Sequence, residues 1–177
     1  MAATGQGRAS ARVNVAGRGE TNVGTGVPVL DHLLVLLATY ASFDLALEVE
    51  PAGSPEVEIA AAARSLGDAL AEPLAAKDVR GHGSADVPVD EALAHVALEA
   101  SGRPLLVSNV DLSEARIAGL AGDLAARFLE EFAQAARLTL HVRLVEGSDT
   151  QHVLEAIFKA LGVALAQACR PRRQEKE

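Results

Sequence analysis

The chain of 177 residues contains few or none of several residue types, and each of these low counts argues against a class of protein. A single cysteine, Cys169, excludes a disulfide framework and any all-cysteine metal cluster. Tryptophan is absent and aromatic residues make up only 3%, so the core must be built mainly from alanine, leucine and valine. Basic residues number 16 against 24 acidic ones, and a net charge of −8 argues against a nucleic-acid-binding protein. No apolar run approaches the roughly 20 residues that a membrane span needs.

The abundant residue types are typical of a folded protein. Apolar residues at 49% exclude intrinsic disorder, and the length suits one domain or two small halves that share a core. Residues 1–10 contain no apolar segment resembling a signal peptide, which predicts a cytoplasmic protein. Residues 1–10 and 170–177 are too polar to offset their ordering entropy, so both are predicted to be flexible tails.

The chain between these tails repeats itself. Residues 12–74 overlay 107–169 without a gap when shifted by 95, and 13 of the 63 pairs are identical, including Gly67 with Gly162. The repeat predicts a first half over 11–81 and a second half over 82–169.

Each half contains the same series of predicted elements. The series is a helix (31–41 and 124–136), an alternating strand (Phe43–Glu50 and Leu138–Val145), a short loop, and a long Ala-rich helix (56–72 and 151–168). Strand-and-helix units in tandem predict an α/β or α+β domain made by duplication. Further strands are predicted over 82–112; their counterparts would fall within 1–17, whose weaker composition predicts a lost or frayed strand in the first half.

The start of the second long helix carries the best cluster of polar side chains. Gln151 and Glu155 are four residues apart, so they share a helix face, whereas His152 faces elsewhere. An imidazole and a carboxylate alone make a weak metal site. A polar helix N-terminus that satisfies its own amides explains the same residues.

Three more residues could contribute to a site. His32 lies among leucines, where a histidine is more often a hydrogen-bonded core residue than a ligand. Arg103, in a Ser-Gly-Arg-Pro turn, and Lys159 could pair with a phosphate or carboxylate. Lys159 one helical turn beyond Glu155 is equally explained as an ordinary surface ion pair.

Several ordered motifs resemble the imidazoleglycerol-phosphate dehydratase family, the manganese enzymes of histidine biosynthesis, over about residues 12–168. The motifs are LDHLL (30–34), FDL (43–45), PVDEAL (88–93), SGRP (101–104), LHVR (140–143) and EAIFKA (155–160). The resemblance implies an α+β fold of two βαβ-type halves, similar to domain 2 of ribosomal protein S5, each with a four-stranded sheet and helices on one face. It also implies trimers that metal-bearing interfaces join into a hollow shell.

The chain departs from the family's metal-binding motifs. The first His-His pair and its glutamate fall on Glu56, Val57 and Ala60, and a further ligand histidine falls on Arg127. Only His32, His152 and Glu155 keep a family ligand identity, since Gln151 replaces one histidine of the second motif. No catalytic residue can be assigned, because the tail offers only Gln6 where the family has a catalytic glutamate.

The replacements lead to three hypotheses. Arg127 could occupy the position of a lost metal and pair with Glu155 and Glu56, while His32 and His152 would face Val57 and Ala60. We therefore expect no bound cofactor, no dehydratase turnover, a trimer rather than a shell, and a retained phosphate site at Arg103 and Lys159. The alternatives are a working dehydratase with rearranged oxygen ligands, and a partner subunit that modulates a true dehydratase.

Overall fold

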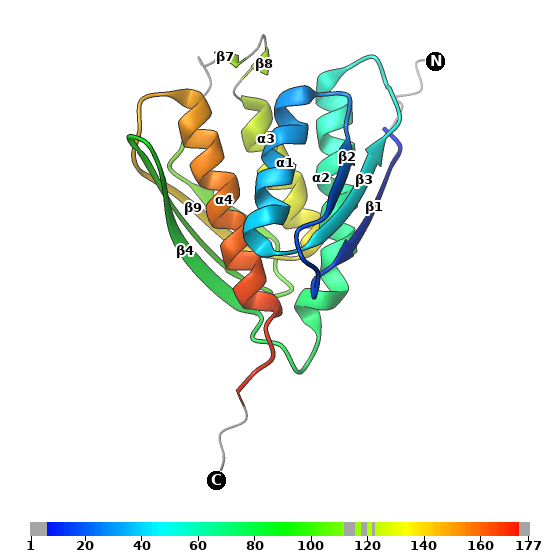
Figure 1. The fold of residues 1–177 in the computed structure, drawn as a ribbon, viewed down its shortest axis with the longest axis vertical. Coiled ribbons are helices and arrows are strands. Elements are labelled where there is room, and N and C mark those ends of the chain that lie inside the picture. Colours follow the sequence, from blue (N-terminus) through cyan, green and yellow to red (C-terminus); the bar gives the residue numbers. More distant parts are fainter. Residues whose placement is uncertain (1–6, 112–115, 118–119, 122, 174–177) are drawn as a thin grey trace.

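A computed structural model describes residues 7–111, 116–117, 120–121 and 123–173, and it shows a mixed α+β fold (Figure 1). The elements in chain order are β1 (Ala9–Asn14), β2 (Thr21–Gly24), α1 (Pro28–Ala41), β3 (Asp44–Val49), α2 (Pro55–Ala75), β4 (His82–Val89), β5 (Ala92–Glu99), β6 (Leu105–Ser108), β7 (Arg116–Ile117), β8 (Leu120–Ala121), α3 (Asp123–Ala136), β9 (Thr139–Glu146) and α4 (Thr150–Cys169). The fold class and every helix expected from the sequence are confirmed.

The two larger sheets lie on the outside and the four helices lie between them (Figure 1). The first sheet has the order β1-β3-β2 and the second has the order β4-β5-β9-β6, while β7 and β8 form a separate two-stranded pair. The sheet of four strands matches the expectation for the second half. The first sheet has three strands among the described residues, in agreement with the strand loss that the repeat predicts.

The internal repeat holds for the helices but not, at a single spacing, for the strands. Both α1 and α3 have 14 residues, and their first residues, Pro28 and Asp123, are 95 apart. The strand pairs follow a different spacing: Ala9 pairs with Val49, and the corresponding pair is Ala94 with Leu144. The gap-free overlay is therefore wrong before α1. By strand register, the stretch between β6 and α3 in the second half is ten residues longer than the equivalent stretch between β2 and α1 in the first half. This added stretch includes β7 and β8.

Two glycines allow the helix layers to approach closely. A Cβ on Gly162 would lie 2.3 Å from the carbonyl oxygen of Leu37, which places α4 directly against the backbone of α1. A Cβ on Gly67 would lie 2.9 Å from the carbonyl oxygen of Phe132, at the equivalent crossing of α2 and α3. Backbone contact of this kind needs a residue without a side chain. The identical glycines of the repeat are thus explained by one steric requirement that occurs twice.

The described ends of the chain are more ordered than the sequence suggests. Ala9 and Ser10, predicted to belong to a tail, begin β1. At the other end, Pro171 forms an isolated bridge with Val79, and Arg172 donates from its backbone nitrogen and from Nε to the carbonyl oxygens of Asp78 and Val79. Residues 170–172 therefore pair with the loop before β4. Hydrogen bonds to backbone groups hold this segment in place, although it buries little apolar surface. The remaining parts of the predicted tails, 1–6 and 174–177, lie outside the described residues.

Helix α4 is long and apolar enough, at 20 residues, to span a membrane by length and composition alone. This differs from the expectation drawn from the sequence. Two thirds of its apolar window is buried inside the fold, where it packs on β4, β5 and α1. These contacts explain its composition as that of a core helix.

Candidate functional site

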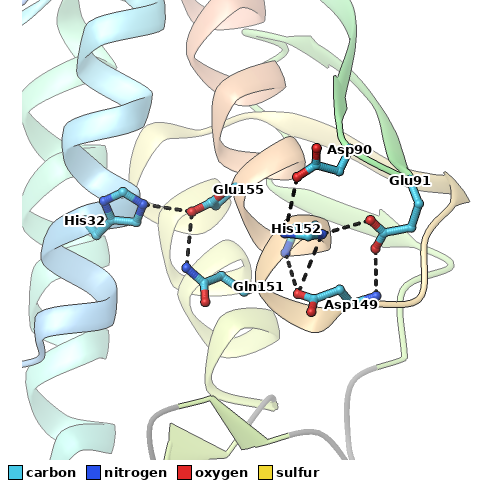
Figure 2. A network of polar contacts seen from close by, with 7 residues as sticks. All are labelled: His32, Asp90, Glu91, Asp149, Gln151, His152 and Glu155. Atoms are coloured by element: carbon cyan, nitrogen blue, oxygen red, sulfur yellow. Dashed lines mark hydrogen bonds and ion pairs between the residues drawn. The ribbon is translucent and has the colours of Figure 1, made fainter.

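The N-terminal turn of α4 gathers the polar side chains that the sequence singles out (Figure 2). Asp149 caps the helix by accepting a hydrogen bond of 3.1 Å from the backbone nitrogen of His152. Gln151 and Glu155 meet on one face, with 3.4 Å between Gln151 Nε2 and Glu155 Oε1, and His152 points to another face. The predicted division of this turn into two faces is confirmed.

On the first face, the side chain of Glu155 contacts His32 on α1. Its Oε1 lies 2.8 Å from Nε2 of His32, and the His32 side chain is 53% exposed whereas Glu155 is mostly buried. Burial by itself would raise the pKa of Glu155, but hydrogen bonds from His32 and Gln151 outweigh it and hold the pKa below its ordinary value. His32 is thus a partner of a carboxylate at the helix surface, not a core residue surrounded by leucines.

On the second face, His152 is held by the turn between β4 and β5. Its Nδ1 lies 2.8 Å from Oε2 of Glu91, and its Nε2 lies 3.4 Å from Oδ2 of Asp90. Glu91 also accepts a hydrogen bond of 2.8 Å from the backbone nitrogen of Asp149. This bond and the one from His152 lower the pKa of Glu91 to about 2, and Glu91 in turn raises the pKa of His152 above its ordinary value.

Sequence reasoning missed the partners of His152. Asp90 and Glu91 belong to the PVDEAL motif, one of those that carry the family resemblance. The sequence signal that could have found them is the pair of adjacent acidic residues in a two-residue turn between two predicted strands. In the structure Asp90 has a φ of 48°, in the left-handed region where glycine, asparagine and aspartate are enriched, and this places both carboxylates at the turn.

At the corresponding position in the first half, the part of the chain that the structure describes lacks the polar pair that His152 and Glu155 provide. Glu56 is exposed in the first turn of α2, Val57 is half-buried and Ala60 is buried. His32 and His152 therefore do not face Val57 and Ala60 as a shared site, since each histidine contacts its own carboxylates.

The predicted ion pair of Arg127 with Glu155 and Glu56 is not formed within the described chain. The Arg127 side chain is 53% exposed, and its Nη2 lies 3.9 Å from Oε1 of Glu131 on the same helix. The reason is local geometry, because residues four apart on a helix meet at the surface without crossing to another element. Within the described chain Arg127 therefore pairs with its own helix, and its pairing with Glu155 or Glu56 stays a prediction.

The two candidate phosphate-binding residues are not brought together within one chain. Lys159 lies on the side of α4 that faces α1, with its Nζ 5.1 Å from the ring centroid of Tyr40. Arg103 is exposed in the turn before β6, where its backbone nitrogen donates to Oγ of Ser101. The turn is thus held by its backbone, and the Arg103 side chain has no ion-pair partner in the part of the chain that the structure describes.

The described residues do not form a manganese site. No group of three or more His, Cys, Asp or Glu side chains among them is placed to hold a metal ion. Both ring nitrogens of His152 lie beside carboxylate oxygens, and the raised pKa of His152 favours the doubly protonated ring, which has no lone pair for a metal. Manganese prefers several oxygen and nitrogen donors in an octahedral array, and Val57, Ala60 and Arg127 cannot provide them.

Comparisons with known proteins agree with the motifs. The family model described as imidazoleglycerol-phosphate dehydratase matches residues 25–165. The chain is 39% identical over 172 residues to a protein of that name from Pelobacter propionicus, covering 94% of this chain and 87% of the relative. It is 41% identical over 172 residues to one from Syntrophobacter fumaroxidans, covering 94% and 86%.

Solved structures show the same similarity. The imidazoleglycerol-phosphate dehydratase from Staphylococcus aureus has a TM-score of 0.85 and 29% identity, covering 93% of this chain and 94% of its own. The enzyme from Pyrococcus furiosus also has a TM-score of 0.85, with 26% identity, covering 97% and 93%. The chain thus matches these proteins in both sequence and fold over nearly its whole length.

Proposed function

The chain belongs to the imidazoleglycerol-phosphate dehydratase family, and we propose that it is a member without metal sites and without dehydratase activity. The observation that carries this proposal is the replacement of metal donors by Val57, Ala60 and Arg127. Valine and alanine have no donor atom, and a guanidinium is a permanent cation that repels a metal ion. The family reaction relies on metal to bind the substrate's imidazole ring and to stabilise charge as water leaves.

The protein retains the fold and, in this proposal, binds a small phosphorylated ligand through Arg103 and Lys159. Both side chains are cations that match the charge of a phosphate, and Arg103 has no competing ion pair among the described residues. Since they do not meet within one chain, the ligand would bind where Arg103 of one subunit approaches Lys159 of another. The oligomer is a cytoplasmic trimer, because metal no longer joins trimers into a shell. Light scattering in metal-free buffer tests the trimer, and a cubic shell in that buffer contradicts it.

Metal content together with turnover tests the loss of activity. The chain is purified after growth in manganese-supplemented medium, and bound metals are measured by elemental mass spectrometry. The Staphylococcus aureus dehydratase, prepared in parallel, is the positive control. We expect manganese far below one ion per chain and no turnover of imidazoleglycerol phosphate. Stoichiometric manganese with turnover would overturn the proposal.

The second candidate function is an active dehydratase with rearranged oxygen ligands. The observation that favours it is the 35–41% identity to eight relatives that carry the dehydratase name. A histidine auxotroph that lacks its own dehydratase distinguishes the two candidates. We expect that expression of this chain does not restore growth, whereas the Staphylococcus aureus control does. Growth restored to the level of the control establishes the second candidate.

A further inference from the structure

The outer face of the second sheet carries a row of polar side chains that no function described above uses. Asp86 on β4 pairs in register with His95 on β5, and His95 pairs in register with Arg143 on β9. The residues adjacent to His95 on its strand, Ala94 and Val96, are buried toward the helices, so the row lies on the opposite face of the sheet. His141 lies two residues from Arg143 on the same face.

A shallow hollow of about 590 Å³ opens beside this row. His95, His141 and Arg143 contribute polar lining, and Val107 and Ala97 contribute apolar lining. Asn109 at its edge is fixed, because its side chain exchanges hydrogen bonds of 3.1 and 2.7 Å with the backbone of Leu144. The hollow therefore has a rigid floor of paired strands, which keeps its side chains in place before any ligand arrives.

Asp86 orients the imidazole of His95. Oδ1 of Asp86 lies 2.8 Å from Nδ1 of His95, and an ionised carboxylate only accepts hydrogen bonds, so Nδ1 carries the proton. Nε2 of His95 is thus left to interact with a ligand. Arg143 has no ion pair with any described residue, so its guanidinium is also available. One fixed cation and one oriented imidazole nitrogen together face the hollow.

We propose that this hollow binds phosphate, as the free ion or as a phosphate monoester. Phosphate oxygens accept hydrogen bonds from the planar fork of Arg143. A phosphate monoanion carries an O–H group, which can donate a hydrogen bond to Nε2 of His95 while its other oxygens accept from Arg143. A metal ion is a poorer occupant because Arg143 would repel it. The site is separate from Arg103 and Lys159 and does not depend on their proposed role.

The first sheet shows that the row is not a general property of this fold. The pair equivalent to His95 and Arg143 by the strand register is Ser10 and Glu48. A serine hydroxyl beside a carboxylate offers no cation, so the same position in the first half would repel an anion. The proposed site is therefore specific to the second half.

Chemical modification of histidines by diethyl pyrocarbonate, mapped by peptide mass spectrometry, tests the proposal at any oligomer size. The protein is treated at pH 7 in buffers of equal ionic strength that contain chloride, inorganic phosphate, sulfate or glycerol phosphate. With phosphate at about ten times its Kd, we expect the modification rate of His95 to fall about tenfold. Sulfate, which carries no proton at this pH, is expected to protect less. Protection by glycerol phosphate as well shows that a monoester is accepted, and its absence limits the site to the free ion.

Three controls make the result specific. Exposed His82, at the start of β4, should react equally in all four buffers. Arg143→Gln should abolish the protection of His95. Arg12→Gln, which removes an exposed arginine from the outer face of the first sheet, should leave the protection intact.

Four outcomes overturn the proposal. They are equal modification of His95 with and without phosphate, equal protection by sulfate, protection that survives Arg143→Gln, and a His95 that is unreactive in chloride because another subunit covers this face. Arg103→Gln separates this site from the proposed function, since it should leave the protection of His95 unchanged.

Discussion

The contact between α1 and α4 and the contact between α3 and α2 are equivalent crossings of the repeat that share a glycine, yet they differ at the polar positions near the helix starts. In the first crossing, Gly162 packs on Leu37, and His32 bonds Glu155 near the helix starts. In the second crossing, Gly67 packs on Phe132, but the positions equivalent to the polar pair hold Arg127 and Ala60. Arg127 turns to Glu131 on its own helix.

This difference separates two kinds of constraint. A glycine pressed on a neighbouring backbone cannot be replaced without moving a helix, and both halves retain it. A polar pair at the surface end of the same crossing contributes little to stability, so its presence in one half and absence from the other are compatible with the same fold. The chemistry of this protein could therefore diverge while its architecture remained.

The largest expected effect comes from adding a methyl group at the glycine crossings. Gly162→Ala places Cβ against the Leu37 carbonyl, and we expect the free energy of unfolding to fall by about 2 kcal/mol after the gain in helix propensity is deducted. Gly67→Ala should cost less, about 1 kcal/mol, since its nearest neighbour is the Cβ of Ala135 at 2.7 Å. Urea unfolding at one protein concentration measures both. Equal losses of unfolding free energy, or a larger loss for Gly67→Ala, would contradict the inference that α4 approaches α1 more closely than α2 approaches α3.

The next effect concerns the hydrogen bond between Glu91 and His152, called the clamp below, which the described residues of the first half lack. Ionised Glu91, with a pKa of about 2 against an ordinary 4.5, stabilises the fold above pH 4.5, and this stability is lost as pH falls toward 2. His152, whose pKa is raised, contributes stability that is complete below 6.5 and is lost as pH rises through its folded pKa. Glu91→Gln should therefore be most destabilising between pH 4.5 and 6.5, measured by urea unfolding across pH.

A matched control for that clamp is Glu56→Gln, at the start of α2. Glu56 is exposed and has no hydrogen bond or ion pair with the described residues, so the same neutralisation should show no comparable maximum between pH 4.5 and 6.5. If both variants gave the same pH profile, general surface charge and not the clamp would explain it.

A smaller effect is expected for the pair between α1 and α4. A double-mutant cycle of His32→Ala and Glu155→Ala should give a coupling free energy below about 1 kcal/mol, since His32 is half-exposed and solvent screens the pair. The measurement is the free energy of unfolding of the two single variants and the double variant. A coupling of several kcal/mol would show that the pair is buried by another subunit.

The smallest effect is expected for Arg127→Ala. Because the Arg127 side chain is half-exposed and its nearest carboxylate is 3.9 Å away, the change in unfolding free energy should stay within about 0.5 kcal/mol. Thermal and urea unfolding measure it. A large fall in the unfolding free energy of the oligomer would instead indicate an ion pair between Arg127 and the carboxylates of a neighbouring subunit.

The sequence predicts elements well here and contacts between elements less well. The spacing of Gln151, His152 and Glu155 placed two on one face and one on another, because helix geometry is local. The partners of these residues were missed: His152 is 61 residues away from Glu91, and Glu155 is 123 residues away from His32. The uniform offset of 95 failed at β1 because a comparison of residues does not reveal the register of strands, whereas hydrogen bonding does.

Residue identity predicted the class of fold and the duplication, because periodicity and side-chain chemistry are properties of each segment alone. Three-dimensional packing settled which carboxylate holds each histidine, that Arg127 lies beside Glu131 of its own helix, and that Asp86, His95 and Arg143 align across three strands. These depend on distances between segments far apart in the chain, and such distances are set only when the sheets and helices assemble around one core.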